Sequence, residues 1–521
     1  MREYSGVRMF AGLAAACILL GTIASAEVQR GAQVTREVKH DVSQPLREMV
    51  KNAPKVEPGQ VEMREHLSPK HIFSVTPGAD PVVQENYISE VSTVKGLSFD
   101  GMDGNQGGAI PPDTNGSVGA TQFVEITNFD YAVYDKSTGN QILAPTRINV
   151  IWSGFGGQCQ SYNGGDPIVL WDKLAQRWLV EQLEYTTTNQ VCVAVSTTSD
   201  ATGSYNRYVF NFGQDLPDYP KLSVWPDAYY LSVNSFGFGY GEPCALDRTA
   251  MLAGTAATME CFTPNSSNFS FMPSDMDGAT APPAGEPNHF VELGNTTSTL
   301  NEYEFHVDFV NSQNATFTGP NVIKVPVYTT LCGGGGGACI PQPSGGALLD
   351  GLGDRLMYRL AYRNFGTYES MVVTHSVAPN KNSTAASDVR WYELRATPGG
   401  IFSLYQSGTL QHPTISIWMG SMAMDKMGNI ALGFSATSST VDPSIAYTGR
   451  LATDKLGTME APAVIVQGTG IQQDSNRWGD YSSMSVDPSD DCTFWYTQEY
   501  GKTTGTNWAT RMTSFKFKNC Q

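Results

Sequence analysis

The 521-residue sequence predicts an all-β fold built from about seven similar units. From residue 95 onward, β-branched and aromatic runs of five to nine residues alternate with clusters of Gly, Pro, Asn, Asp and Ser. That alternation is typical of short antiparallel strands. Segments of similar pattern recur at steps of 52 to 68 residues, which is long enough for four strands and their loops. Helical periodicity is weak, which disfavours an α/β enzyme core.

The first 26 residues predict a secretory signal peptide. Arg2 and Arg8 precede an apolar run over residues 9–23 that ends in small residues, so cleavage is expected after Ala26. A lipoprotein signal at Cys17 is disfavoured because apolar residues continue past it. We therefore expect a secreted, extracellular protein.

Residues 27–94 are polar with mixed charge, and they predict a linker or pro-segment outside the core, with one short helix near residues 44–52. Residues 95–521 form the predicted β-domain. No run after the signal approaches the roughly 20 apolar residues of a membrane span.

The repeated units are visible when segments are compared. WMGSMAMDKMGNIALGFSAT (418–437) resembles WGDYSSMSVDPSDDCTFWYTQEY (478–500), and TQFVEITNFDYAVYD (121–135) resembles the segment that begins NHFVELGN at residue 288. Regular repetition at this period predicts a seven-bladed β-propeller, with six or eight blades as alternatives. The predicted units begin at Asp113, Asp166, Asp218, Glu286, Asp354, Trp418 and Asp480.

The second unit shows the full strand set, at residues 167–171, 178–185, 191–197 and 205–212. The last unit shows only three strands, at 481–487, 493–500 and 510–518. We expect residues 96–99 to supply its missing outer strand, because such closure joins the two ends of the ring. Function is expected on the face that carries the long loops 263–285 and 328–353.

Eight cysteines remain when Cys17 is removed, an even number that predicts disulfides in an exported chain. No Cys-x-x-Cys spacing occurs, which disfavours a structural zinc site. Placing the cysteines on the loops of the predicted blades favours sequential pairing, although 105 pairings are formally open. The expected bonds are Cys159–Cys192, Cys244–Cys261, Cys332–Cys339 and Cys492–Cys520.

The chain is acidic, with a net charge of −17. Removing the signal removes two arginines and one glutamate and leaves −18. This charge argues against nucleic acid and anionic membranes as partners. It fits a neutral or cationic ligand, or simply solubility, and we expect a monomer.

Several phrases resemble those of a widespread family of secreted bacterial proteins of unsettled function: PPDTNGSVG, GDPIVLWD, DYPKLSVWPDAYYLSVN, DRLMYRLAYRNFG, RWYELR, WMGSMAMDKMGNIALGFS and RWGDYSSMSVDP. The resemblance covers roughly residues 95–521. It implies an exported bacterial protein with a propeller-like fold, and it assigns no catalytic residues.

Six of the seven units begin with an acid, and these acids are expected to gather at the axis of the propeller. Such a ring can hold Ca²⁺, or it can supply a proton donor and a base to a bound sugar. The simpler alternative is that each Asp caps its own turn. The candidate ring comprises Asp113, Asp166, Asp218, Glu286, Asp354 and Asp480. The candidate sugar-stacking aromatics are Trp152, Tyr162, Trp225, Trp418 and Trp478, although aromatics in a β-rich core are commoner than sugar platforms.

A calcium site is a second hypothesis for the acids near the start of the domain. DGMDGN and DTNGS place oxygen-bearing side chains two or three residues apart, without completing an EF-hand loop. The candidate ligands are Asp100, Asp103, Asp113 and Asn115.

Three arginines alternate with apolar residues in DRLMYRLAYRN: Arg355, Arg359 and Arg363. Pairing with acids inside the propeller is favoured over binding an acidic ligand, because a sialidase needs three arginines from different blades. The histidines are scattered without metal-ligand spacing, and His289 is at most an axial candidate. No serine hydrolase, zincin or phosphate-loop motif occurs in the sequence.

The sequence therefore predicts an extracellular binding or adhesion module for a glycan or protein, with Ca²⁺ as the candidate cofactor. The main alternative is a hydrolase or lyase that acts on extracellular polysaccharide through the acidic ring. A purely structural surface protein is a third hypothesis, and it predicts an axis filled by the protein's own side chains.

Overall fold

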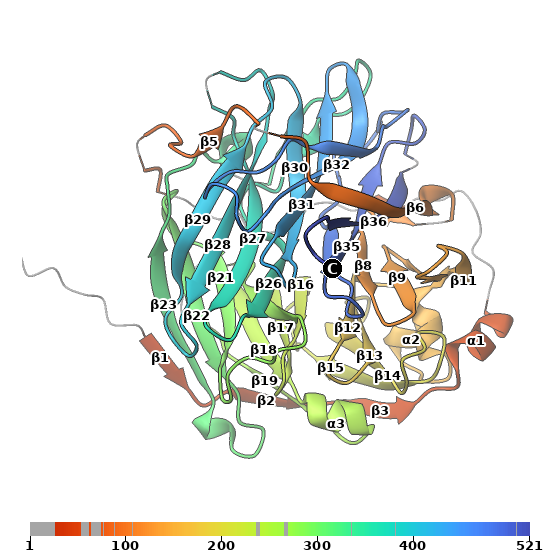
Figure 1. The fold of residues 1–521 in the computed structure, drawn as a ribbon. Coiled ribbons are helices and arrows are strands. Elements are labelled where there is room, and N and C mark those ends of the chain that lie inside the picture. The colour runs from red at the N-terminus through yellow and green to blue at the C-terminus, as the bar shows by residue number, and fades with distance from the viewer. Residues whose placement is uncertain are drawn as a thin grey trace, which may run out of the picture.

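The computed structural model describes residues 27–53, 62–63, 74–76, 78–87, 89–106, 108–235, 240–264, 269–334, 336–380, 382–506 and 508–521. The predicted signal peptide lies outside the described residues. The fold is all-β, with several antiparallel sheets of four or five strands and short helices in the connections (Figure 1). None of the helices in these ranges is long and apolar enough to cross a membrane.

Three sheets follow one another in the first part of the domain. The first has the order β11-β10-β9-β8, the second β12-β13-β14-β15-β3 and the third β16-β17-β18-β19-β2. Their strands are β8 (Asn115–Val118), β9 (Gln122–Ile126), β10 (Asp130–Asp135), β11 (Gln141–Arg147), β12 (Gly165–Asp172), β13 (Arg177–Glu184), β14 (Gln190–Ser196), β15 (Tyr205–Asn211), β16 (Pro217–Val224), β17 (Tyr229–Ser235), β18 (Tyr240–Leu246), β19 (Thr258–Cys261), β2 (Gln33–Arg36) and β3 (Lys39–Val42).

The next two sheets are joined into one of ten strands, in the order β1-β23-β22-β21-β20-β26-β27-β28-β29-β5. The join is a short parallel pairing of β20 with β26. These strands are β1 (Glu27–Arg30), β5 (Val83–Gln84), β20 (Met272–Asp277), β21 (Asn288–Leu293), β22 (Thr299–His306), β23 (Thr316–Lys324), β26 (Met357–Asn364), β27 (Glu369–Val377), β28 (Asp388–Ala396) and β29 (Ser403–Leu410).

Two further sheets have the orders β30-β31-β32-β33 and β34-β35-β36-β6, and two short pairs are β24-β25 and β4-β7. Their strands are β30 (Ser416–Met424), β31 (Ile430–Ser438), β32 (Val441–Arg450), β33 (Ala463–Val466), β34 (Ser483–Val486), β35 (Thr493–Tyr500), β36 (Ala509–Phe517), β6 (Thr93–Asp103), β24 (Ala338–Ile340), β25 (Leu349–Asp350), β4 (Glu62–Met63) and β7 (Ala109–Ile110). The helices are α1 (Leu46–Met49), α2 (Gln158–Ser161), α3 (Arg248–Ala253) and the 3₁₀ turns η1 (Val50–Asn52), η2 (Gly104–Gln106), η3 (Ile148–Trp152), η4 (Ser312–Asn314) and η5 (Leu331–Gly333).

The first strands of the successive sheets contact one another in chain order: β8, β12, β16, β20, β26, β30 and β34. The last of them, β34, also contacts β8, so the contacts form a closed cycle. We call these the inner strands. Their mutual contact places the start of every inner strand near the others.

Strand predictions for the second and last sheets are confirmed. The four strands β12 to β15 match the four predicted segments to within two residues at most ends. The closing strand is also confirmed, because β6 pairs antiparallel with β36 and places Phe99 opposite Met512. The start of the domain therefore completes the sheet at its end.

All four disulfides have the predicted pairing: Cys159–Cys192, Cys244–Cys261, Cys332–Cys339 and Cys492–Cys520. Cys244 and Cys261 face each other directly across the β18–β19 ladder rather than joining two loops. Such a set of disulfides is typical of proteins in an oxidising compartment.

The expectation that residues 27–94 lie outside the core is wrong for their first part. Strands β1, β2 and β3 add an outer strand to three successive sheets, pairing with β23, β19 and β15 (red to orange in Figure 1). We call residues 27–53 the belt. Its short helix follows the prediction, and Leu46 on that helix is fully buried in a hydrophobic cluster. The polar composition of residues 27–53 did not predict these strands, because the belt is held mainly by backbone hydrogen bonds. Such bonds form whatever the side chains are.

The fourth unit also differs from the prediction, since its inner strand is β20 within the expected loop 263–285. Strand β20 carries Asp275 and Asp277, both buried, so its sequence lacks the apolar pattern of a core strand. Their carboxylates are neutralised by Arg359 and Lys173 from other strands. Glu286, the predicted start of this unit, lies instead between β20 and β21.

Candidate functional site

The inner strands begin in an unusual backbone conformation. Asp113, Asp166, Tyr219, Met419 and Asp480 have φ angles of 49°, 48°, 53°, 51° and 59°. This left-handed region is uncommon for residues other than glycine, and Asp is among the few residues that adopt it readily. The Asp at the start of three units, Asp113, Asp166 and Asp480, thus has a local structural cause.

The geometry nonetheless brings five of the six acids of the predicted ring together. Electrostatic interactions connect them to one another and to three cations, Lys221, Arg355 and Arg477. Asp350, which sequence reasoning missed, joins them beside Arg477. We call this group the axial cluster: Asp113, Asp166, Asp218, Asp350, Asp354, Asp480, Lys221, Arg355 and Arg477.

The two arginines of the axial cluster hold carboxylates directly. Arg355 Nε donates to Asp354 Oδ1 at 2.9 Å, and its Nη2 donates to Oδ2 at 3.2 Å. Arg477 pairs with Asp480 and lies 3.4 Å from Asp350 Oδ2. The Asp350 carboxylate also accepts a hydrogen bond from the Trp478 backbone N–H at 2.8 Å. These carboxylates are thus engaged by the protein itself.

Lys221 supplies a third cation from β16, and it is fully buried. Its Nζ lies 3.2 Å from the ring centroid of Tyr219 and 4.0 Å from that of Tyr481. It donates to the Pro220 carbonyl at 2.8 Å. Burial lowers the pKa of this ammonium, although Asp166 opposes the shift. The side chain therefore places a tethered cation among the acids, in an aromatic cage.

Two acids of the cluster have raised pKa values. Burial, with the nearby Asp166 carboxylate, raises the pKa of Asp218 to about 7. Burial also raises the pKa of Asp350 to about 8, against the influence of Arg477. Glu181 on β13 interacts with Asp166 and Lys221, and burial raises its pKa as well. The cluster can therefore donate or accept protons near neutral pH.

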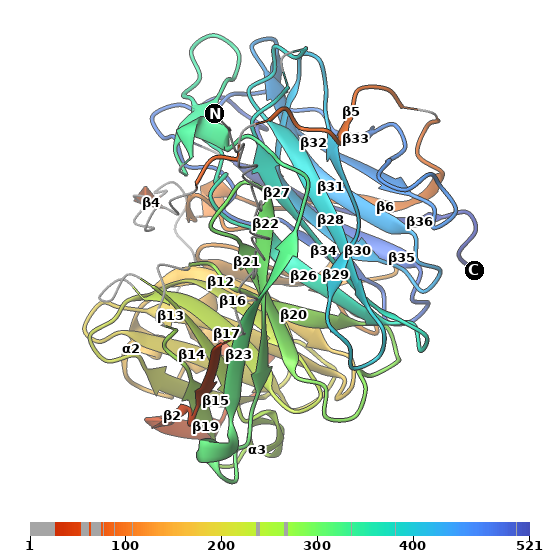
Figure 2. The ribbon, with the colours of Figure 1, turned by 90° about the vertical axis from the view of Figure 1, so that its left-hand side faces the viewer.

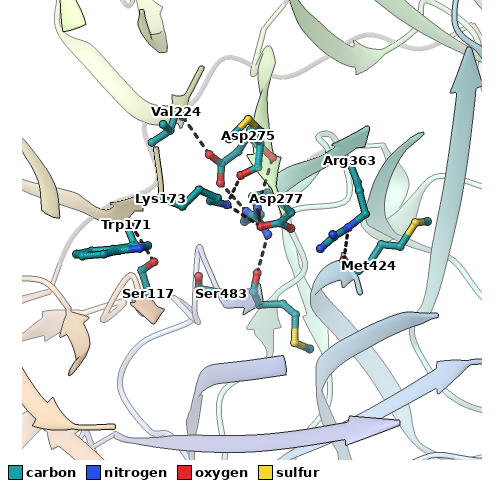
Figure 3. A network of polar contacts seen from close by, with 12 residues as sticks. Ser117, Trp171, Lys173, Val224, Asp275, Asp277, Arg363, Met424 and Ser483 are labelled. Carbon is teal, nitrogen blue, oxygen red and sulfur yellow. Dashed lines mark hydrogen bonds and ion pairs between the residues drawn. The ribbon is translucent and has the colours of Figure 1, made fainter. Parts of the chain in front are cut away.

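The inner strands are also tied by a second charged group, which includes Lys173, Asp275 and Asp277 (Figure 3). Arg359 Nε donates to Asp275 Oδ2 at 2.7 Å, and Arg359 Nη2 lies 2.8 Å from Asp277 Oδ1. Lys173 Nζ lies 3.0 Å from the same Asp277 oxygen. These side chains border a cavity of about 20 Å³, which has room for about one water molecule. Ion pairs of the protein itself thus occupy this part of the space between the inner strands.

The alternating arginines pair with acids, as predicted. Arg355 and Arg359 do so as described above, and Arg363 makes two hydrogen bonds to Asp491, of 2.7 and 2.6 Å. All three are at most 4% exposed. They do not converge on one open position.

The other predicted site residues lie elsewhere. Glu286 lies beside His289, at 3.1 Å, outside the interactions of the axial cluster. Trp418 and Trp478 are buried, with ring centroids 5.9 Å apart, so neither ring is an open stacking surface. Among the candidate aromatics, Tyr162 is the exposed one, at 42%.

The four predicted calcium ligands have different hydrogen-bond partners, although Asp100 and Asp103 both interact with Lys502. Asp100 pairs with Lys502 at 2.9 Å and Arg511 at 2.8 Å. Asp103 accepts a hydrogen bond from the backbone N–H of Asn105. The Asn115 side chain accepts one from the Val169 N–H, and Asp113 belongs to the axial cluster.

A groove of about 580 Å³ lies on the outer edge of the sheet of β26–β29, and sequence reasoning missed it. It is lined by residues 81–86 around β5, residues 404–407 of β29 and the loop 455–458. Figure 2 shows β5 at the same end of the molecule as β32 and β33. The volume of the groove falls within the usual range of ligand sites.

Tyr405 is an exposed aromatic residue on the wall of this groove, with 42% of its surface accessible. Its ring lies 3.6 Å from the guanidinium carbon of Arg395, and Tyr368 lies on the same guanidinium at 4.2 Å. Arg395 is in turn held by Glu393. This stack fixes the Tyr405 ring in place, so its outer face is available without reorganisation.

The walls of the groove are also fixed. The Gln84 side chain accepts from the Met459 N–H at 2.7 Å and donates to the Met459 carbonyl at 2.6 Å. The Gln406 side chain accepts from the Gly457 N–H at 2.9 Å. An aromatic residue followed by polar residues on an outer strand, as Tyr405 is in SLYQSGTL, is the sequence signal that could have found this site.

No family model matches the chain, and no curated protein matches it. Among solved structures, the chain is similar to the subtype N10 neuraminidase-like protein of A/little yellow-shouldered bat/Guatemala, with 8% identity and a TM-score of 0.38 over 71% of this chain and 100% of that one. It is also similar to the WD40 domain of SCAP from fission yeast, with 10% identity and a TM-score of 0.31 over 76% and 82% of the two chains. A third is 1,3Gal43A, an exo-beta-1,3-galactanase from Clostridium thermocellum, with 9% identity and a TM-score of 0.30 over 64% and 74%. Likenesses at these TM-scores carry no information on activity.

Proposed function

We propose that the chain is an exported seven-bladed β-propeller that acts as an extracellular glycan-binding module. The blade count is supported by the closed cycle of contacts among the inner strands. Export is supported by the four disulfides and by the apolar run that follows Arg8.

The observation that carries the binding proposal is the open groove beside the rigid Tyr405 ring. A tyrosine presents a flat apolar face together with a polar hydroxyl, which suits a sugar ring with its apolar face and hydroxyl rim. The exposed Glu85, Asn86 and Lys455 add polar groups to the same groove. The overall negative charge favours a neutral glycan over an acidic one.

The alternative function is a polysaccharide hydrolase or lyase that uses the axial cluster. The raised pKa values of Asp218 and Asp350 and the lowered pKa of Lys221 favour it, since acid–base catalysts have such shifts. The Arg355–Asp354 and Arg477–Asp480 pairs argue against it, because they engage the acids internally.

Incubation of the purified protein with a panel of polysaccharides separates the two functions. If the protein is a binding module, it binds at least one polysaccharide of the panel, and no new reducing ends or unsaturated products form. Product release that is lost in Asp218→Asn would establish the enzyme instead.

Calcium binding stays a prediction for the axial cluster, where six carboxylates surround three cations. If Ca²⁺ binds there, it raises the thermal unfolding midpoint relative to chelator, and Asp166→Asn and Asp480→Asn reduce the rise. An unchanged midpoint with Ca²⁺ would show that Lys221, Arg355 and Arg477 suffice as counter-ions.

A further inference from the structure

Another group of ionisable side chains lies on the hairpin of β21 and β22, and its members neither line the groove nor belong to the axial cluster. His289 on β21 lies directly opposite Glu304 on β22, and Glu302 is two residues earlier on the same strand face. His289 Nδ1 lies 2.8 Å from Glu302 Oε1. One ligand atom from each of these three residues lies within 4.8 Å of the other two.

We propose that His289, Glu302 and Glu304 form a binding site for a divalent transition-metal ion such as Zn²⁺. Imidazole nitrogen and carboxylate oxygen are both zinc ligands, with bonds of about 2.0 to 2.2 Å. A tetrahedral ion separates its ligand atoms by about 3.4 Å on that bond length. The three ligand atoms therefore need to move only by about 1 Å to bind.

Glu286 orients the histidine for this role. Its Oε1 lies 3.1 Å from His289 Nε2, the ring nitrogen on the far side from Glu302. A carboxylate that accepts the second N–H of a metal-binding histidine fixes the ring and its tautomer. Nδ1 then faces Glu302 Oε1 at 2.8 Å, and a bound ion would displace the proton that these two atoms share.

The charge around the site also favours a cation. Glu369 on β27 interacts electrostatically with Glu286 and His289, so four carboxylates surround one imidazole. His289 and Glu302 are at most 2% exposed, and the rings of Trp225 and Phe402 pack against His289. A divalent ion would offset this buried negative charge more fully than a single imidazolium does.

Three protein ligands leave at least one coordination position for water or a ligand group, as in zinc sites that act on a substrate. Glu304 is half-buried, which gives this position a side toward solvent. The other trio of this kind in the described chain, Glu242 with Cys244 and Cys261, is excluded because its two sulfurs form a disulfide. The metal site is independent of the glycan-binding proposal.

The test is a titration of chelator-treated protein with Zn²⁺ by calorimetry, with Co²⁺ absorption as a second readout of ligand geometry. We expect one saturable site per chain and an affinity lower by at least about tenfold in Glu304→Gln, as well as in Glu286→Gln. The matched control Glu242→Gln should bind as the parent does, because its partly buried carboxylate lies on a different sheet.

His289→Gln should abolish the site, and circular dichroism checks its folding. If that variant does not fold, the Zn²⁺ affinity of Glu304→Gln tests the proposal instead. The Glu304 side chain is half-buried, and replacement by an amide preserves its shape. Absence of a saturable Zn²⁺ site in the parent, or equal affinity in parent and Glu304→Gln, would overturn the proposal.

Discussion

Arg359 is the residue on which the inner strands depend most for charge balance. It contacts Asp275, Asp277 and the Met484 carbonyl, and all of these groups are buried. Removing one partner of a buried ion pair leaves the other uncompensated, which costs more than the pair contributes.

We expect Arg359→Met to lower the free energy of unfolding by about 3–5 kcal/mol, because two aspartates lose their main cation. Urea denaturation measures the change. Arg511→Met is the control, since its pair with Asp100 is partly exposed and should cost at most about 1 kcal/mol. Equal effects of the two substitutions would show that the buried network does not hold the inner strands together.

Several buried carboxyl groups bind protons in the folded protein that the unfolded chain releases. Burial raises their pKa to about 7 for Glu125 and Asp218 and to about 8 for Asp350 and Asp388. A raised carboxyl pKa makes stability fall as pH rises from the unfolded value, near 4, through the folded value. We therefore expect a lower thermal midpoint at pH 8.5 than at pH 5.

Glu125→Gln should reduce this loss of stability at high pH. Glutamine does not titrate, so the substitution removes one of the protons that the folded protein binds. Its side chain accepts hydrogen bonds from the Met102 N–H and the Tyr134 hydroxyl, at 3.1 and 3.3 Å, that an amide oxygen also accepts. Differential scanning calorimetry between pH 5 and 8.5 measures both proteins. A midpoint that rises with pH over this range would contradict the pKa shifts.

At the scale of elements, the belt is the main departure from the sequence-based expectation. It extends three sheets by one strand each, and α1 inserts Leu46 into the cluster that contains Trp152. Its outer strands are mostly exposed, so their side chains carry no apolar pattern from which pairing could be predicted.

Leu46→Ala should destabilise the protein by about 2–5 kcal/mol, because the leucine is fully buried and its removal leaves a cavity. Val28→Ala in the same segment should change stability by at most about 0.5 kcal/mol, since Val28 is 45% exposed. Chemical denaturation measures the free energy of unfolding of both variants. If neither substitution changes it, the belt is not part of the folded core in solution.

The sequence predicted the regular sheets, the closing strand β6 and the four disulfides, because strand alternation, turn residues and cysteine position are local signals. It failed at β20, where buried aspartates depend on an arginine more than 80 residues away. It assigned Glu286 and His289 to the axis and missed Glu302 and Glu304, since only the hairpin register brings these two glutamates to His289. Tyr405 was missed because exposure on an outer strand depends on the neighbouring loop 455–458.

At the scale of the whole molecule, the inner strands form a closed cycle tied together by buried ion pairs, and the groove beside Tyr405 lies at the outer edge of a sheet. The third hypothesis, a structural protein, accounts for these internal ion pairs but gives no reason for a rigid, exposed Tyr405 beside the groove. A module that binds its ligand in the outer groove accounts for both features, because the internal ion pairs then stabilise the fold and the groove binds the glycan.

The most direct measurement is the dissociation constant of Tyr405→Ala for a polysaccharide that the parent protein retains, compared with the constants of the parent and of Tyr162→Ala. Both tyrosines are 42% exposed, but Tyr162 lies beside α2, away from the groove. The account predicts an affinity weaker by about tenfold or more for Tyr405→Ala and unchanged for Tyr162→Ala, because an aromatic contact of about 1–1.5 kcal/mol is lost only in the first. Equal affinity of all three proteins would contradict the groove as the glycan site.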